Sequence, residues 1–185
     1  MLQIVIQGRG GQGAQTAGNL LAMAFYAEGR QVQCFASYGG ARRGTPVSSF
    51  LRVDDRPVRL RCDIERADAI LCFDASLLQA PLLARADERT TIVVNSALPA
   101  AQLQAQAAGL RIVAVDAMSI SRSLGLGRIV NSALLGALAC ALGAPSRAAL
   151  ARTLVEQSPK LHDANLAACE DGYASIEAQL KGIAA

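Results

Sequence analysis

The sequence predicts an α/β fold: a single Rossmann-like domain with a mostly parallel sheet. Short, continuously apolar runs alternate with stretches of helical periodicity, as in domains whose parallel strands are buried on both faces. A glycine cluster follows the first apolar run, at the place where such folds turn from strand to helix. The 185 residues contain no internal repeat or linker, so residues 1–185 are expected to form one domain with one core.

Each predicted element rests on one of these patterns. Buried strands are expected at residues 2–6, 32–36, 69–73, 91–95 and 111–115. Helices are expected at about 14–25, 76–86, 99–108, 130–142, 146–156 and 161–181, the first of them ending at Gly29. Residues 47–53 and 57–61 alternate in polarity around Asp54-Asp55-Arg56, which predicts a β-hairpin insertion. From Ile129 onward only helices are expected, so the C-terminal part is predicted to be helical.

Composition and charge limit the function classes. Apolar residues make up 52% of the chain and aromatic residues 4%, so the core is expected to consist of Leu, Ala, Val and Ile. The net charge of +3 is too small for a general nucleic-acid binder. Basic residues cluster within 42–66, which leaves a local anion site open. The sequence has neither a signal-peptide pattern nor an apolar run of membrane-spanning length, so a cytoplasmic protein is expected.

No metal centre or catalytic set is predicted. The five cysteines do not form a CxxC pair, and they are expected to be reduced, buried thiols: Cys34, Cys62, Cys72, Cys140 and Cys169. The single His162 lies between Lys160 and Asp163 in a predicted helix and is expected at the surface. We find no nucleophile motif and no carboxylate pair, and we therefore assign no catalytic residue.

The glycine cluster is the first candidate site. Gly8, Gly10 and Gly13 fit G-x-G-x-x-G between a strand and a helix, where backbone N–H groups can approach an anion. Dinucleotide binding also needs a carboxylate at the end of the second strand, and residues 35–38 offer none. The cluster thus holds the phosphate of another ligand, such as coenzyme A, or it is only a tight structural turn.

A glycine-rich loop with two adjacent arginines is the second candidate. Arg42 and Arg43 can clamp a phosphate or carboxylate in bidentate geometry, or pair with acidic groups of a partner chain, or simply be solvated. Asp116 follows the strand at 111–115, at a position where α/β folds bind ligands. It is predicted instead to cap the next helix.

Several segments together resemble a known family. The chain resembles the gamma subunit of the 2-oxoacid:ferredoxin oxidoreductases, the pyruvate/ketoisovalerate oxidoreductase gamma family. The likeness spans nearly the whole chain and is carried by GRGGQGAQTAGNLLAMA (8–24), FASYGGARRGTPVSSFLRV (35–53), AILCFDASLL (69–78), GRIVNSALLGALACALG (127–143) and NLAACEDGY (165–173).

The resemblance implies a subunit of an enzyme that oxidatively decarboxylates a 2-oxo acid to an acyl-CoA and passes electrons to ferredoxin or a related acceptor. It implies alpha, beta and delta partner subunits, which hold thiamine diphosphate and 4Fe-4S clusters. The gamma subunit would pack on alpha and help to form the coenzyme A side of the site. The residues expected to face coenzyme A or the alpha subunit are Gly8, Gly10, Gly11, Gln12, Gly13, Arg42 and Arg43.

Two other functions stay open at this point. One is a stand-alone nucleotide-binding or regulatory module, and the other is an assembly factor that binds no ligand. The particular 2-oxo acid (pyruvate, branched-chain, indole or aryl), the electron acceptor (ferredoxin or NAD) and the stoichiometry are not predicted, because the other subunits determine them.

Overall fold

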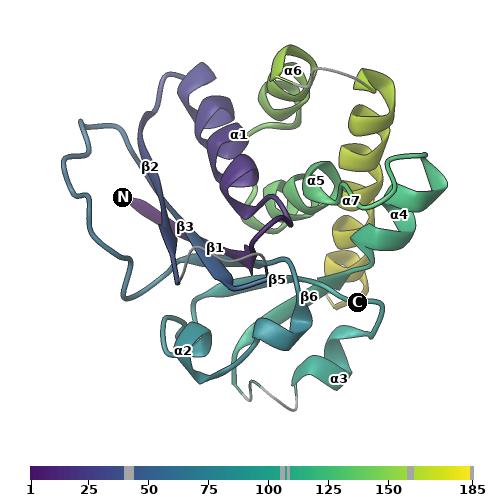
Figure 1. The fold of residues 1–185 in the computed structure, drawn as a ribbon, viewed down its shortest axis with the longest axis horizontal. Helices are drawn as coiled ribbons and strands as arrows, with labels where there is room; N and C mark the ends of the chain where they lie inside the picture. Colours follow the sequence, from purple (N-terminus) through teal and green to yellow (C-terminus); the bar gives the residue numbers. More distant parts are fainter. Residues whose placement is uncertain (40–43, 105–106, 108, 158–160, 184–185) are drawn as a thin grey trace.

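The sheet of the computed structural model is mixed, with mostly parallel strands (Figure 1). The structure describes residues 1–39, 44–104, 107, 109–157 and 161–183. Within these residues the six strands follow the order β2-β3-β1-β4-β5-β6. Their bounds are β1 Leu2–Arg9, β2 Gln31–Tyr38, β3 Pro46–Asp54, β4 Ala69–Cys72, β5 Thr91–Asn95 and β6 Arg111–Val115. Among them only β3 runs against the rest, because it pairs antiparallel with both β1 and β2.

Helices cover both faces of the sheet unequally (Figure 1). One face carries the longer helices: α1 (Ala14–Ala27), α4 (Ala117–Ser123), α5 (Asn131–Leu142), α6 (Arg147–Gln157) and α7 (His162–Ile183). The other face carries α2 (Ala80–Leu83), α3 (Ala100–Gln104) and a 3-10 turn at Ala75–Leu77. Alternate residues of β1 supply the two cores: Ile4 and Ile6 face the long helices, and Val5 faces the short ones. The predicted α/β class and helical C-terminal part are thus confirmed.

The predicted hairpin has a different second arm. Residues 47–53 do form a strand, but β3 pairs with β2 across the connection at 39–45 and not with residues 57–61. Both edges of β3 are already occupied, by β1 on one side and β2 on the other. Residues 57–61 therefore cannot pair with β3, and they run as an irregular, mostly exposed segment. The prediction of a strand at 57–61 was wrong.

The helix predictions were accurate in the C-terminal part and less so around the short helices. The segment predicted as a helix at 76–86 is a 3-10 turn followed by the four residues of α2. The helix predicted at 99–108 is α3, which ends at Gln104, and residues 105, 106 and 108 lie outside the described residues. Helix α4 was predicted only as the helix that Asp116 caps, without bounds. It begins after Asp116, which confirms that residue as a helix cap: its Oδ1 accepts from the Ser119 N–H at 2.9 Å.

Helices α5 and α7 approach each other closely through glycine. A Cβ on Gly136 of α5 would lie 1.9 Å from the carbonyl oxygen of Cys169, and one on Gly172 of α7 would lie 2.0 Å from that of Ala133. Backbone therefore meets backbone on both sides of the contact, which brings α7 down onto the central helix of the long-helix layer. This contact supports the start of α5, next to the site described below.

Candidate functional site

The glycine cluster forms a tight turn from β1 into α1. Gly11 and Gly13 both have a φ of +92°, a conformation that favours glycine, and Gly13 is the N-cap of α1. A Cβ on Gly13 would also lie 2.7 Å from Oδ1 of Asn131, the first residue of α5. Gly8 is confined by its neighbours as well, since a Cβ there would lie 3.0 Å from that of Ala14. These glycines are therefore required by geometry, whether or not a ligand binds.

Gln12 has a structural task within this turn. Its side-chain Oε1 accepts a hydrogen bond from the backbone N–H of Arg9 at 2.7 Å, and its own N–H donates to the carbonyl of Arg9 at 2.9 Å. The side-chain carbonyl of Gln12 is therefore engaged by the turn. Gly10 and Gly11 are among the residues that line the groove described below.

Arg9 joins the glycine turn to two neighbouring segments. Its Nε donates to Oδ2 of Asp74 at 3.0 Å, Nη2 donates to the hydroxyl of Ser76 at 2.8 Å, and Nη1 donates to the carbonyl of Gly44 at 3.3 Å. Burial tends to raise the pKa of Asp74, but hydrogen bonds from Ser76 and Arg9 outweigh burial and hold the pKa below its usual range. Sequence analysis did not single out Arg9, whose side chain fixes the carboxyl ends of β1 and β4.

The end of the arginine-containing loop is attached to the glycine turn. The Gly10 N–H donates to the carbonyl of Thr45 at 2.8 Å, and the Gly44 N–H donates to the carbonyl of Gly10 at 3.3 Å. The structure thus brings together the two glycine-rich stretches that the sequence singled out. Arg42 and Arg43 themselves lie outside the described residues.

A groove of about 720 Å³ opens beside the glycine turn, at the carboxyl end of the parallel strands. Open α/β sheets bind ligands at this end, and the volume lies within the usual range of small-molecule sites. Two arginines face it, and the described residues that line it include no carboxylate. The lining is Gly10, Gly11, Gln12, Phe73, Asn95, Met118, Arg122, Arg128 and Val130.

Asn95 fixes the floor of this groove. Its Nδ2 donates to the carbonyl of Phe73 at 3.1 Å, and its Oδ1 accepts from the N–H of Ala117 at 3.1 Å. The amide side chain therefore ties the end of β4 to the start of α4. This tie holds α4 in place, and with it Arg122 in the last turn of that helix.

Arg122 and Arg128 are the site residues that sequence reasoning missed. Both are exposed, and neither has an ion pair or side-chain hydrogen bond to any described residue. They lie on and just after α4, a helix for which no bounds were predicted, so no pattern linked them to the glycine turn. The usable signal was the segment GRIV at 127–130, which belongs to one of the stretches that carry the family resemblance.

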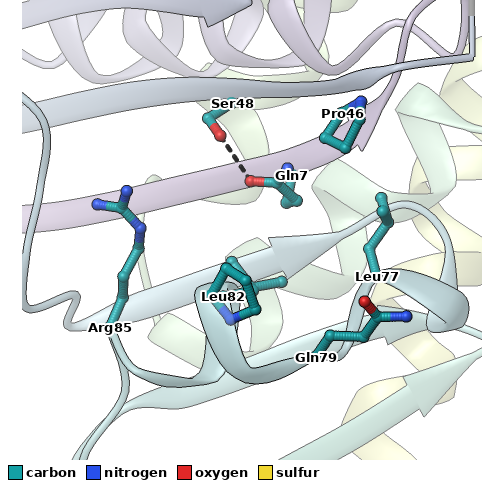
Figure 2. A pocket seen from close by; sticks show the side chains of 8 residues that line it. Gln7, Pro46, Ser48, Leu77, Gln79, Leu82 and Arg85 are labelled. Atoms are coloured by element: carbon teal, nitrogen blue, oxygen red, sulfur yellow. Dashed lines mark hydrogen bonds between the residues drawn. The ribbon is translucent and has the colours of Figure 1, made fainter. Parts of the chain in front are cut away.

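A smaller pocket of about 170 Å³ lies on the other face of the sheet, beside α2 (Figure 2). The Ser48 hydroxyl donates to Oε1 of Gln7 at 2.6 Å within it. Its one charged group, the Arg85 guanidinium, is already engaged by the carbonyl of Ile64 and the carboxylate of Asp63. This pocket therefore has fewer free donor groups for an anion than the groove has.

The remaining sequence predictions concern metals, thiols and His162. Within the described part of the chain, no cluster of three or more His, Cys, Asp or Glu side chains could hold a metal ion. All five cysteines are free, and burial raises the pKa of Cys72 and of Cys169 to about 12. Only Cys72 and Cys169 are buried, whereas Cys34 and Cys140 are half-buried and Cys62 is exposed, so the prediction of buried thiols was wrong for these three residues. His162 lies at the surface, as predicted, with a ring nitrogen 3.0 Å from the carbonyl of Val155. None of the described helices is long and apolar enough to cross a bilayer.

The strand order also differs from that of the dinucleotide-binding fold. In the dinucleotide-binding fold the second strand lies next to the first, and its terminal carboxylate reaches the ribose. Here β3 is inserted between β1 and β2, which moves the end of β2 away from the glycine turn. Fold and site together define an α/β protein with a glycine turn and a basic groove at the carboxyl edge of its sheet, without a catalytic or metal-binding set among its described residues.

Comparison with known proteins identifies the family of the chain. Residues 3–175 match the family model described as pyruvate ferredoxin/flavodoxin oxidoreductase, and the chain belongs to this family. It is 34% identical to the common gamma subunit of the pyruvate/ketoisovalerate oxidoreductases of Pyrococcus furiosus, over 96% of this chain and 98% of that one. It is 34% identical to the gamma subunit of the NADH-dependent phenylglyoxylate dehydrogenase of Aromatoleum evansii, over 95% of this chain and 94% of that one.

The structure agrees with this assignment. The crystal structure of the pyruvate oxidoreductase subunit PORC from Thermotoga maritima matches with a TM-score of 0.84 and 30% identity, over 94% of this chain and 95% of that one. The resemblance drawn from the sequence is confirmed: the chain is a gamma-type subunit of a multi-subunit 2-oxoacid oxidoreductase, an enzyme subunit and not a complete enzyme.

Proposed function

We propose that this subunit supplies part of the coenzyme A side of its oxidoreductase, and that the groove at the carboxyl edge receives coenzyme A phosphates. The observation that carries the proposal is that Arg122 and Arg128 line the same groove as the turn at Gly10 and Gly11. Guanidinium groups and backbone N–H groups at a helix N-terminus are the usual protein donors to phosphate.

The charge of the groove supports an anionic ligand. The carboxylate of Asp74, which follows β4, is already paired with Arg9. Arg122 and Arg128 have no such partner among the described residues, so their charge is available to a ligand. A tightly bound neutral ligand would leave two guanidinium groups partly desolvated without an acceptor, which is unfavourable.

Arg42 and Arg43 are proposed to face the same ligand or the alpha subunit. The support is the attachment of their loop to the turn through Gly44 and Thr45. Gly8 and Gly13 are proposed to shape the turn, and Gly10, Gly11 and Gln12 to line the ligand site.

The rest of the enzyme is proposed from the family to which the chain belongs. The partners would be alpha, beta and ferredoxin-like delta subunits, with thiamine diphosphate and 4Fe-4S clusters held by those subunits and ferredoxin or a related carrier as electron acceptor. The reaction would yield an acyl-CoA from a 2-oxo acid. We propose a cytoplasmic location, which the free cysteines support.

Steady-state kinetics of the assembled enzyme test the ligand site. Replacing Arg122 and Arg128 with Ala should raise the KM for coenzyme A by about tenfold or more, since a hydrogen bond to a charged group contributes about 1.5–3 kcal/mol. The KM for the 2-oxo acid should stay within about twofold. Arg152→Ala, at an exposed position of α6, is the matched control. An unchanged KM for coenzyme A in the double variant would exclude this groove as the phosphate site.

The pair Arg42→Ala and Arg43→Ala separates ligand from partner contacts. A raised KM for coenzyme A with normal assembly assigns these arginines to the ligand, whereas loss of assembly assigns them to the subunit interface. The stand-alone nucleotide-binding alternative has its own test, titration of the isolated chain with NADH. Saturable NADH binding there would favour that alternative over the coenzyme A site.

A further inference from the structure

The connection from β3 to β4 is unusually long for a compact domain. Residues 55–68 contain neither helix nor strand, and in Figure 1 this segment extends away from the sheet near the N-terminus. Leu2 of β1 lies opposite Val53 of β3, so the segment starts at the amino-terminal end of β1. It is therefore at the end of the sheet opposite to the groove. Irregular connections of this length usually have a function.

Buried side chains hold this segment in place. Arg52 of β3 is only 3% exposed, and its guanidinium donates to the carbonyls of Cys62 at 2.8 Å and Asp63 at 3.2 Å. The Arg85 side chain donates to the carbonyl of Ile64, whose own side chain is fully buried. The segment is thus fastened to β3 and to Arg85, two residues beyond the end of α2, and the side chains that it displays are held in a fixed place.

The acidic groups near the segment are largely neutralised within the chain. The carboxylate of Asp54 lies 3.2 Å from the N-terminal ammonium group. Asp55 lies 2.9 Å from Nε of Arg30, and Asp63 lies 3.5 Å from Arg85. Asp68 accepts from the Gln3 N–H at 2.7 Å, and Glu65 is the remaining acid, next to Arg66 in the sequence.

The arginines at the outer part of the segment are not neutralised in this way. Arg56, Arg59 and Arg61 are exposed, and their side chains have no ion pair or hydrogen bond to any residue that the structure describes. Leu60 among them is 50% exposed, and Met1 beside them is 59% exposed. Arginine and methionine are enriched in protein interfaces, where an apolar centre is combined with polar groups.

We propose that this arginine loop, defined as Arg56, Arg59, Leu60 and Arg61, docks on an acidic surface of another subunit of the oxidoreductase. Charge complementarity identifies the partner's chemistry: three uncompensated guanidinium groups on a fixed platform attract carboxylates. Membership of a family of multi-subunit enzymes identifies the kind of partner, and the inference does not depend on the coenzyme A site. Because the loop and the groove lie at opposite ends of the strands, both can be engaged at once.

Association kinetics test the proposal. The full-length chain is mixed with the complex of the remaining subunits, and the association rate is followed against NaCl concentration. Arg59→Glu with Arg61→Glu should slow association by about tenfold or more at low salt, and the difference should shrink towards 1 M NaCl, where charges are screened within about 3 Å. Arg59→Lys with Arg61→Lys should keep most of the wild-type rate.

Control variants distinguish an effect of the loop on docking from an effect of the chain's net charge. Arg111→Glu with Arg152→Glu makes the same charge change at exposed positions of β6 and α6, and it should leave the rate nearly unchanged. Equal slowing by this control, or an unchanged rate in the loop variant, would overturn the proposal. If the variant with Arg59→Glu and Arg61→Glu does not fold, the same measurement is made on the variant with Arg59→Gln and Arg61→Gln. Loop-dependent binding of RNA or self-association, in place of subunit binding, would also overturn it.

Cys62 offers a second readout without any substitution in the loop. Its thiol is exposed, whereas Cys72 and Cys169 are buried and serve as internal references. Iodoacetamide should modify Cys62 in the isolated chain and at least tenfold more slowly in the assembled enzyme. Equal labelling in both states would contradict docking at this loop. In fully assembled enzyme the loop variants should keep the wild-type KM for coenzyme A, which distinguishes a failure here from a failure of the groove.

Discussion

Asp74 and Arg9 link the carboxyl ends of two neighbouring strands next to the groove. Their ion pair spans 3.0 Å, and both side chains remain partly exposed. The Asp74 carboxylate also accepts from the backbone and hydroxyl of Ser76, so one acidic side chain caps a turn and holds Arg9. The pair therefore sets the shape of the glycine turn more than it adds to stability, since exposed ion pairs contribute little.

The lowered pKa of Asp74 gives a pH-dependent prediction. Since its native pKa lies below the unfolded value of about 4, the ionised group stabilises the fold above that pH. This contribution is lost as the pH falls below about 4 and through the native pKa. In Asp74→Asn, urea unfolding between pH 3 and 6 should show a smaller loss of stability on acidification than in wild type. Identical pH profiles would mean that Asp74 does not contribute in this way.

Individual site residues were predictable from the sequence only where they belong to a local sequence motif. Gly8, Gly10 and Gly13 were found because a strand-to-helix turn imposes glycine at short, fixed spacing. Arg122 and Arg128 lie more than a hundred residues further along the chain, and only the folding of the whole domain brings them to the turn. Long-range placement of this kind has no periodicity, so the sequence alone did not indicate it.

At the scale of elements, the contact between α5 and α7 depends on two glycines. Gly136→Ala should place a methyl group against the carbonyl of Cys169 and force the helices apart. We expect the free energy of unfolding to fall by about 1–3 kcal/mol, although Ala is the better helix former by about 1 kcal/mol. Chemical denaturation measures this directly.

Ala174→Ser, at an exposed position of α7, is the control for this prediction. It should change the stability by less than about 0.5 kcal/mol. If Gly136→Ala proved as stable as wild type, the helices would not be as close as the structure has them.

The strands illustrate what local patterns can and cannot predict. Continuous apolar runs correctly placed β1, β4, β5 and β6, because a strand buried on both faces must be apolar throughout. The alternation at 57–61 suggested a strand just as well, but a strand also needs a free sheet edge. Here β2 occupies that edge, and pairing between distant segments was not readable from the sequence.

At the scale of the whole molecule, the two ends of the sheet have different tasks in this account. The carboxyl end presents a groove with two arginines that have no partner among the described residues, and the amino end presents the arginine loop on a fixed platform. Neither end contains a complete catalytic set among the described residues, which is consistent with a subunit that works only within a larger enzyme. The α/β class and family membership were predictable from the sequence, because the quoted segments span most of the chain.

The most direct test of the central claim is a cryo-EM map of the assembled oxidoreductase with coenzyme A bound. We predict density for coenzyme A phosphates against Gly10 and Gly11 of this subunit, within hydrogen-bond distance of Arg122 or Arg128. Coenzyme A bound entirely by other subunits, with this groove empty or filled by a partner's side chains, would contradict the account.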